Sequence, residues 1–409
     1  MYVTPFWHYE TTDRETALSN TVTGRQVTVP AGALDTLGAV FADPGLPMPG
    51  ELLAALAPAE IVFPDREAAD TWLAGSLAQV RERPLIDQIE LTNRCPYTCQ
   101  MCPRTSSMTR ELGSMEIPLF ERIIEQIAPY QQYTALHHFG ESLLHPEIDT
   151  AVRVARAHGV KTGLSCNPPS LTPRLSRRLL DAGLANMVLS LDSLDARTYR
   201  SIRGHAARLD KADKHVRRIV EARDEGGYDT WITLQMIAMR ANQSEIDGFL
   251  SYCEEVGVDR GIVVRLGRWD FEDDKVEDLG GHDSPGYTAP CTLPQSSVVV
   301  LWDGRVVPCC HDYDGDVVLG DLNTQTLEEV WASPAAQRFR ERNEDYELCR
   351  QCAFSRWFKE SQREKDGFTD FHRKRTTALS VRYEWTNPAS LSRGDGGELF
   401  DRFDVYTRD

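Results

Sequence analysis

The chain has 409 residues, of which 41% are hydrophobic and 26% are charged, and its formal net charge is −17. This composition is typical of a soluble globular protein of two or three domains. The acidic net charge argues against a nucleic-acid partner, which would require a basic stripe, so we expect no such partner. The sequence has no apolar run of about 18 residues, which predicts no transmembrane helix and no membrane partner.

The amino-terminal stretch MYVTPFWHYE contains neither the basic nor the apolar region of a signal peptide. The chain has 10 cysteines. Without an export signal, cysteines are typical of a reducing compartment and of metal ligation, not of disulfides. We therefore expect a cytoplasmic protein.

Residues 1–82 are predicted to form a small α+β domain. Residues 21–24, followed by the alternating Val27 and Val29, predict a hairpin. Helical patterns follow at 33–41, 51–56 and 67–80. Together these elements predict a winged-helix-like domain, and the alternative is a stabilising amino-terminal extension.

Residues 83–280 alternate predicted strands with helices. We expect strands at 85–91, 133–139, 160–165, 186–192, 230–236 and 261–266. Helical patterns separate them at 119–127, 148–157, 173–182, 211–223 and 243–256. This alternation predicts an α/β domain with a parallel sheet and helices outside it. Such folds place their chemistry at the carboxyl ends of the strands.

Residues 281–358 change character. The stretch SSVVVLWDGRVVPCC predicts a hairpin that turns at Asp303 and Gly304, and a helix is predicted at 327–342. The remaining extension, residues 359–409, is polar, with a basic stretch at 372–375 and an acidic end. Three interpretations of this extension are open: it packs back on the sheet, it closes over a substrate, or it is partly mobile.

Three cysteines, Cys95, Cys99 and Cys102, follow the first of the six strands in the run CPYTCQMC. Three thiolates are one short of the four that fill a cubane iron–sulfur cluster, so one iron would stay open to another ligand. The alternatives are a structural zinc knuckle or a chance cluster. Zinc motifs usually pair C-x2-C with a second nearby pair, and none lies nearby in this sequence.

This C-x3-C-x2-C spacing resembles the signature of the radical S-adenosylmethionine (radical SAM) superfamily. Met101 takes the hydrophobic place before the third cysteine, where aromatics are commoner. The resemblance implies a partial (β/α)6 TIM-like barrel and a [4Fe–4S] cluster with an iron open to S-adenosylmethionine (AdoMet). It also implies reductive cleavage of AdoMet to a 5′-deoxyadenosyl radical, which abstracts a hydrogen atom from the substrate. Met101 is counted among the expected cofactor-binding residues.

Four further stretches resemble AdoMet-binding features of the superfamily. FGES resembles its GGEP motif, so Gly140 would let the backbone approach the methionine moiety and Glu141 would take its ammonium. By the same resemblance, Asn167 would lie near the ribose, and Ser190 and Arg203 would bind the carboxylate. The alternative for Arg203 is a solvated charge at a helix end, and for Asn167 a turn residue.

A second cysteine set, Cys291, Cys309, Cys349 and Cys352, resembles the SPASM/twitch auxiliary-cluster domains. The resemblance implies one auxiliary [4Fe–4S] cluster that is fully ligated by these four thiolates. Such a cluster would accept or relay an electron. The alternative is a four-cysteine zinc ribbon.

Other catalytic candidates are less sharply indicated. Cys166, at a strand mouth, would return a hydrogen atom to a substrate radical, or is a small packed residue. Cys310 is an alternative ligand or hydrogen donor, or packs on its strand. His137 would act as a base, and Arg265 and Arg268 would bind the substrate; the alternatives are a core histidine and surface arginines.

Within the superfamily, the chain is similar to 2-deoxy-scyllo-inosamine dehydrogenase-type enzymes. That similarity implies oxidation or epimerisation of a carbinol carbon in an aminoglycoside, aminocyclitol or sugar of antibiotic biosynthesis, with a flavodoxin or ferredoxin-type reductant. The alternative is a maturase that crosslinks or epimerises a ribosomally made peptide, because residues 1–82 faintly resemble the leader-binding domains of such enzymes. A non-catalytic iron–sulfur electron carrier or a zinc scaffold is the alternative of another class.

Overall fold

The structure, a computed structural model, describes residues 1–4, 7–11, 15–20, 25–77, 81–266, 278–280, 291, 293–352 and 383–387. They form two compact units. The first contains the described residues up to 82, between 291 and 296, and between 349 and 352; the second contains the others. The division into domains at 1–82, 83–280, 281–358 and 359–409 stays a prediction.

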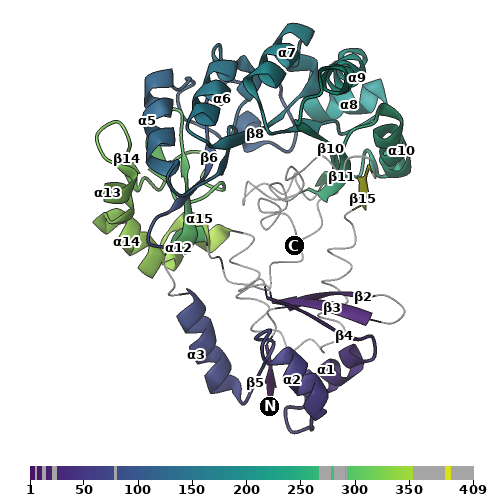
Figure 1. The fold of residues 1–409 in the computed structure, drawn as a ribbon, viewed down its shortest axis with the longest axis vertical. Coiled ribbons are helices and arrows are strands. Elements are labelled where there is room, and N and C mark those ends of the chain that lie inside the picture. Colours follow the sequence, from purple (N-terminus) through teal and green to yellow (C-terminus); the bar gives the residue numbers. More distant parts are fainter. Residues whose placement is uncertain are drawn as a thin grey trace. The chain divides into compact units, whose positions relative to one another are not determined.

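The first unit is built on antiparallel strands (Figure 1). One sheet pairs β1 (Tyr2–Val3) with β5 (Val62–Phe63). The other has the order β2 (Trp7–Thr11), β3 (Glu15–Asn20) and β4 (Gln26–Pro30). The β3–β4 pair corresponds to the predicted hairpin, whose connection at 21–24 lies outside the described residues.

The first unit also contains the helices α1 (Ala33–Ala42), α2 (Gly50–Leu56) and α3 (Arg66–Leu77), and the short helix α12 (Leu293–Ser296). Leu18, Leu37, Leu56 and Ile61 are fully buried in one hydrophobic cluster that β3, α1 and α2 share. The unit therefore has a core of its own. Its likeness to a winged helix stays a prediction.

The second unit contains a ten-stranded sheet with the order β14-β13-β12-β6-β7-β8-β9-β10-β11-β15. Neighbouring strands from β6 to β11 run parallel and follow chain order, as the strand–helix alternation predicts. The fold is therefore α/β around a mainly parallel sheet, while closure into a partial barrel stays a prediction. The bounds are β6 (Leu85–Ile89), β7 (Tyr133–Ala135), β8 (Lys161–Cys166), β9 (Asn186–Ser190), β10 (Trp231–Ala238) and β11 (Arg260–Arg265).

Helices connect these strands (Figure 1). Local chemistry sets their ends: α7 starts after Thr172, whose hydroxyl accepts a hydrogen bond from Leu175 N, and stops at the left-handed Gly183. None of the helices in the described part of the chain is long and apolar enough to cross a membrane. The helices are α4 (Pro103–Ser106), α5 (Ile117–Ile127), α6 (Ile148–Ala157), α7 (Pro173–Ala182), α8 (Ala196–Arg203), α9 (Leu209–Gly226) and α10 (Ile246–Val256). Short 3-10 turns are η1 (Ser142–Leu144), η2 (Pro168–Ser170), η3 (Gln243–Glu245) and η4 (Asn343–Asp345).

Strands from later in the chain extend this sheet at both edges. The predicted hairpin turns at Gly304, whose φ is 91°, and β12 runs parallel to β6. At the other edge, β15 (Tyr383–Thr386), from the carboxyl-terminal extension, pairs antiparallel with β11. The remaining bounds are β12 (Ser297–Val300), β13 (Arg305–Val307), β14 (Gly320–Asp321) and α15 (Glu347–Gln351).

The single helix predicted at 327–342 is wrong, because the chain forms two helices there, α13 (Leu327–Trp331) and α14 (Pro334–Glu341). Ser333 accepts a hydrogen bond from Ala336 N and starts the second helix. Pro334 has no N–H to continue the first helix but suits the first turn of the second.

A buried ion pair connects the end of β6 to the hairpin region. The Glu90 carboxylate is fully buried and accepts from Arg110 Nη1 and Nη2 at 2.7 and 2.8 Å. It also accepts from the backbone N of Phe139 and of Trp302, each at 3.3 Å. Arg110 Nε donates to Tyr313 O at 2.7 Å. One carboxylate therefore holds three chain segments together.

Replacing Arg110 by alanine should destabilise the protein strongly, because it leaves the Glu90 carboxylate buried without its counter-ion. We expect urea denaturation to show a loss of about 3–5 kcal/mol in the free energy of unfolding. The control is Arg217→Ala, which breaks exposed ion pairs with Asp213 and Glu255 and should cost less than about 1 kcal/mol. Equal losses of unfolding free energy in the two variants would contradict the prediction that the buried pair stabilises the protein more than the exposed pairs do.

Candidate functional site

The cysteines of CPYTCQMC lie in the segment after β6, at the carboxyl end of that strand. We call residues 94–107 the cluster loop. Its backbone is hydrogen-bonded to the last residues of α8: Thr98 N donates to Arg203 O at 3.2 Å, and Gln100 N donates to Ile202 O at 2.9 Å. The end of α8 therefore fixes the course of the cluster loop.

Gly204 lies at this contact, directly after α8. Its φ of 84° and ψ of −173° belong to a region that is essentially restricted to glycine. A Cβ atom at this position would lie 2.0 Å from Thr98 Oγ1. Backbone conformation and lack of space therefore both require glycine where α8 meets the cluster loop.

The three thiols influence one another electrostatically. Burial raises the pKa of Cys95 to about 12 and that of Cys99 to about 11, and it also raises the pKa of Cys102. Cys99 further raises the pKa of Cys95, Cys102 raises that of Cys99, and Arg203 lowers those of Cys99 and Cys102. Three converging thiols with a buried cation beside them fit a three-cysteine iron–sulfur cluster, since iron displaces the thiol protons.

The FGES stretch packs on the chain that leads into the cluster loop. Gly140 has a φ of 143°, and a Cβ atom there would lie 2.1 Å from Thr92 O. Glu141 N donates to Arg94 O at 2.8 Å. The Glu141 carboxylate is fully buried. Burial raises its pKa, the hydrogen bonds from Asn167 lower it, and the net result is a pKa of about 7.

Glu141 begins a buried series of hydrogen bonds, which we call the polar chain: Glu141, Asn167, Arg203 and Asp192. Asn167 donates to Glu141 Oε2 from its backbone N at 2.9 Å and from Nδ2 at 2.8 Å. Arg203 Nη1 donates to Asn167 Oδ1 at 2.7 Å. Arg203 Nε donates to Asp192 Oδ2 at 2.5 Å. Three predicted AdoMet-binding residues therefore lie together.

Asp192 is held firmly in turn. Its Oδ1 accepts from Ile237 N at 2.8 Å, and its backbone O accepts from Asn242 Nδ2 at 2.6 Å. Although burial lowers the pKa of Arg203, the Asp192 carboxylate raises that pKa above its ordinary value. Arg203 is therefore a permanent buried cation, not the solvated charge at a helix end that its sequence position also allowed.

Three further predicted residues are buried near these elements. Ser190 ends β9, and Met101 lies in the cluster loop. Cys166 ends β8 directly before Asn167, and burial, assisted by Glu141, raises the pKa of its thiol well above the ordinary value. Cys166 thus keeps its hydrogen, as a hydrogen-atom donor must, but that role and the AdoMet contacts of Ser190 and Met101 stay predictions.

The predicted base, His137, is a hydrogen-bond acceptor. Its Nδ1 accepts from Ser165 N at 3.1 Å, so the proton of the neutral ring lies on Nε2. Burial lowers the pKa of His137 to about 4. In this tautomer Nε2 carries the ring proton, and the lone pair of Nδ1 is used by Ser165 N. His137 could therefore act as a base only after the ring proton had moved to another atom. The neighbouring His138 places Nδ1 2.8 Å from Gln88 Oε1 and packs edge to face on Phe139.

The other catalytic candidates are only partly placed. Arg265 is described through its backbone, at the end of β11, and Arg268 lies outside the described residues. Cys310 is half-buried and packs against the hydrophobic cluster of Val299, Leu301 and Val307. The substrate-binding roles of the two arginines and the alternative role of Cys310 stay predictions.

The second cysteine set is divided between the two units. Cys291, Cys349 and Cys352 belong to the first unit, and Cys309, which follows β13, belongs to the second. Burial raises the pKa of Cys291 to about 12, with a smaller contribution from Cys352, although Cys291 also has exposed surface. The influence of Cys352 is the more informative observation, because it shows that these two thiols are neighbours.

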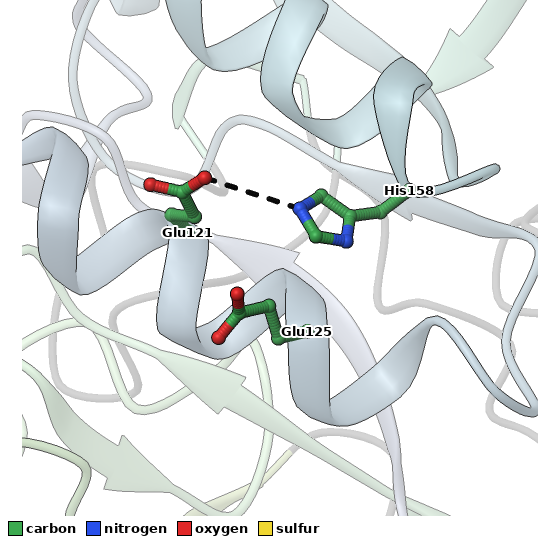
Figure 2. Close-up of side chains that lie close together, drawn as sticks. All are labelled: Glu121, Glu125 and His158. Atoms are coloured by element: carbon green, nitrogen blue, oxygen red, sulfur yellow. Dashed lines mark ion pairs between the residues drawn. The ribbon is translucent and has the colours of Figure 1, made fainter.

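A further group of metal-ligating side chains is exposed on the helices. Figure 2 shows Glu121 and Glu125 on α5 and His158 just after α6. One ligand atom from each lies within 4.8 Å of the others, and His158 Nε2 is 4.0 Å from Glu121 Oε1. Both glutamates are exposed, and exposed acidic groups commonly approach one another without a metal, so we assign no function to this group.

Sequence reasoning missed two residues of the site. Asp192 stands two positions after Ser190, and the period of a strand puts both on one face, so alternation could have indicated it. Gly204 was missed because its importance arises from its close contact with Thr98, which is distant in sequence.

Comparison with known families gives two matches. The family described as "Radical SAM superfamily" matches residues 89–253, which contain the cluster loop and the polar chain. The family described as "SPASM: Iron-sulfur cluster-binding domain" matches residues 291–353, which contain the second cysteine set.

Similar proteins carry different chemistries. The tungsten-containing aldehyde ferredoxin oxidoreductase cofactor-modifying protein of Pyrococcus furiosus is 23% identical over 65% of this chain and 86% of its own length. The S-adenosyl-L-methionine-dependent 2-deoxy-scyllo-inosamine dehydrogenase of Niallia circulans is 20% identical over 65% of this chain and 91% of its own. The structure of Streptococcus suis SuiB bound to precursor peptide SuiA matches 90% of this chain and 97% of SuiB, with a TM-score of 0.52 and 13% identity, which shows a shared fold.

If Glu141 takes the ammonium of AdoMet, AdoMet binding should weaken as the pH falls below about 7. The pKa of Glu141 is raised from 4.5 to about 7, so below that pH the carboxyl group of the free protein holds a proton that AdoMet must displace. We expect the apparent Kd of the cluster-loaded protein to rise about tenfold per pH unit in equilibrium dialysis. Glu141→Gln is the control and should bind weakly at every pH. A wild-type Kd that stays constant between about pH 8 and pH 6 would overturn this role.

Asp192 is predicted to position Arg203 for the AdoMet carboxylate. Asp192→Asn presents an amide to the guanidinium and should raise the Kd for AdoMet about 10- to 100-fold, as expected for a lost charged hydrogen bond of about 1.5–3 kcal/mol. Turnover at saturating AdoMet should change much less. The matched control is Asp210→Asn, which removes an exposed partner of Arg208; an unchanged Kd in Asp192→Asn would exclude the positioning role.

Proposed function

The chain belongs to the radical SAM superfamily and carries its SPASM iron–sulfur region, and we propose that it abstracts a hydrogen atom from a natural-product substrate. The observation that carries this proposal is the cluster loop held against the polar chain within one unit. Members of this family bind AdoMet and iron–sulfur clusters. Cluster and AdoMet together supply the 5′-deoxyadenosyl radical that attacks the substrate.

The residues of this chain have distinct tasks in that chemistry. Cys95, Cys99 and Cys102 would hold three irons of the cluster. Glu141 would take the AdoMet ammonium. Arg203 would bind the carboxylate through Nη2, which makes no hydrogen bond among the described residues, whereas Nε and Nη1 are used by Asp192 and Asn167. The polar chain would thus orient the guanidinium and leave its Nη2 available for the AdoMet carboxylate.

We further propose that Cys291, Cys309, Cys349 and Cys352 hold one auxiliary [4Fe–4S] cluster. The family match over 291–353 and the neighbouring thiols of Cys291 and Cys352 support this set. Four thiolates leave no iron open for a substrate. Electron acceptance or relay is therefore the role that such a cluster could serve.

For the substrate, we favour a ribosomally made peptide that the enzyme crosslinks or epimerises. The first unit has its own core and a three-stranded sheet whose outer strands, β2 and β4, pair with no further strand among the described residues. An open sheet edge can accept an extended peptide by strand addition. The shared fold with SuiB extends beyond the two matched families, which supports a role for this unit in binding a leader peptide.

The second candidate is oxidation or epimerisation of a carbinol carbon in an aminoglycoside, aminocyclitol or sugar. It is favoured by the relative that is named a 2-deoxy-scyllo-inosamine dehydrogenase, which matches over 91% of its length. After loss of the hydrogen atom, oxidation needs a base for the hydroxyl proton and an acceptor for one electron. Epimerisation instead needs a hydrogen donor, for which Cys166 is suited by its protonated thiol.

Anaerobic reconstitution tests the two-cluster proposal. We expect about eight irons per chain, corresponding to two four-iron clusters, and 5′-deoxyadenosine formation with AdoMet and dithionite. Replacing Cys291 and Cys309 together by alanine should lower the iron content to about four. The control Cys310→Ala should keep about eight, because this neighbour is assigned no iron.

Zinc in place of iron, or intact clusters without AdoMet cleavage, would overturn the proposed activity in favour of a scaffold or an electron carrier. Substrate panels then separate the two candidates. Precursor peptides or deuterated aminocyclitols are expected to raise 5′-deoxyadenosine formation above the rate without substrate. When either kind of substrate is deuterated, deuterium in the 5′-deoxyadenosine identifies the compound whose C–D bond is broken.

A further inference from the structure

The cluster loop with the residues after it up to Arg110, and α8 with the residues after it up to Leu209, form a basic region in an acidic protein. Residues 94–110 contain three arginines and no acidic residue, and residues 196–209 contain four arginines, one histidine and no acidic residue. The whole chain has 62 acidic and only 45 basic residues. Two acid-free segments are therefore a local reversal of the overall charge.

These two segments form one surface. Backbone hydrogen bonds from Thr98 and Gln100 connect the cluster loop to the end of α8. Arg110 and Arg203 are buried in the ion pairs described above. The other arginines reach solvent: Arg94, Arg197, Arg200 and Arg208 are exposed and Arg104 is half-buried. We call these five residues the basic surface.

Parts of the cluster loop are themselves exposed. Pro96, Thr98 and Gln100 are exposed between the cysteines, and Cys95 and Cys102 are only half-buried. A protein that delivers electrons must come close to the cluster, because electron transfer slows steeply with distance. The exposed cluster loop is therefore a place where a donor could approach.

Stability does not account for all of these charges. Arg200, in the last turn of α8, complements the helix dipole, but Arg197 is in the first turn, where the dipole disfavours a cation. Arg208 is partly neutralised by Asp210. Exposed arginines are also screened by salt, so they compensate the cluster charge less than the buried Arg203 does. Arg197 is likewise partly offset by the exposed Asp195 beside it. Five arginines against these two aspartates still leave a positive excess, which an anionic partner could complement.

We propose that the basic surface docks an acidic one-electron donor protein of the flavodoxin or ferredoxin type. This inference rests on the proposed function, in which one electron must reach the cluster for each AdoMet cleaved. Complementary charges would steer the donor to the cluster loop and orient it there, even though the two proteins repel each other overall. The donor loses one electron and the cluster gains it.

The test uses the cluster-loaded full chain and its double variant Arg197→Glu, Arg200→Glu. Formation of 5′-deoxyadenosine is measured with a reduced acidic flavodoxin and, separately, with dithionite. We expect the flavodoxin-driven kcat/KM to fall about tenfold or more at low salt, and the difference to shrink as ionic strength rises. The dithionite-driven rate should stay unchanged, because a small reductant needs no docking surface.

The matched control is Arg156→Glu with Lys161→Glu. Both residues are exposed, and they lie between the end of α6 and the start of β8, at the amino end of the parallel strands and so opposite the cluster loop. It changes the net charge equally and should leave flavodoxin-driven turnover unaffected.

Equal losses in the two double variants, or a loss with dithionite as well, would overturn the docking inference. Absence of dithionite-driven 5′-deoxyadenosine in the wild-type protein would instead overturn the proposed function, and the docking inference with it.

Discussion

The polar chain is the constraint on which the site depends. Taking a carboxylate, a guanidinium and a second carboxylate out of water costs free energy unless each finds its partners. Asn167 supplies those partners, since its amide donates to Glu141 and accepts from Arg203. Because Arg203 also ends α8, and α8 carbonyls hold the cluster loop, the same contacts that satisfy the buried charges set the place of the cysteines.

The Glu90–Arg110 pair applies the same physical rule where the chain enters and leaves the cluster loop. Glu90 belongs to the chain just before the loop, and Arg110 to the chain just after it. Their contacts with Trp302 and Tyr313 extend to the hairpin region. The loop that carries the thiols is thus enclosed by two buried charge networks, and neither can be broken without leaving a charge in the interior.

Local patterns predicted most of the second unit. The six parallel strands and the main helices follow from apolar periodicity and turn residues, which act over a few neighbours. The residues predicted to bind AdoMet come from motifs at strand ends, and the structure places Glu141, Asn167 and Arg203 in one hydrogen-bonded series. What escaped prediction depends on distant partners: the course of the cluster loop requires α8, and α8 itself is polar and short. At 327–342, by contrast, a local signal was overlooked, because Ser333 and Pro334 mark the break between helices.

The fit of Gly204 against Thr98 has a consequence for protein engineering. A cluster loop grafted from a related enzyme would meet an α8 terminus at which Gly204 leaves no space for a Cβ atom beside Thr98. Thr98 and Gly204 are 106 positions apart in sequence (204 − 98), yet the loop and the helix end behave as one exchangeable module. Chimeras and shuffled libraries that inherit both pieces from one parent should retain cluster assembly more often than those that recombine between them.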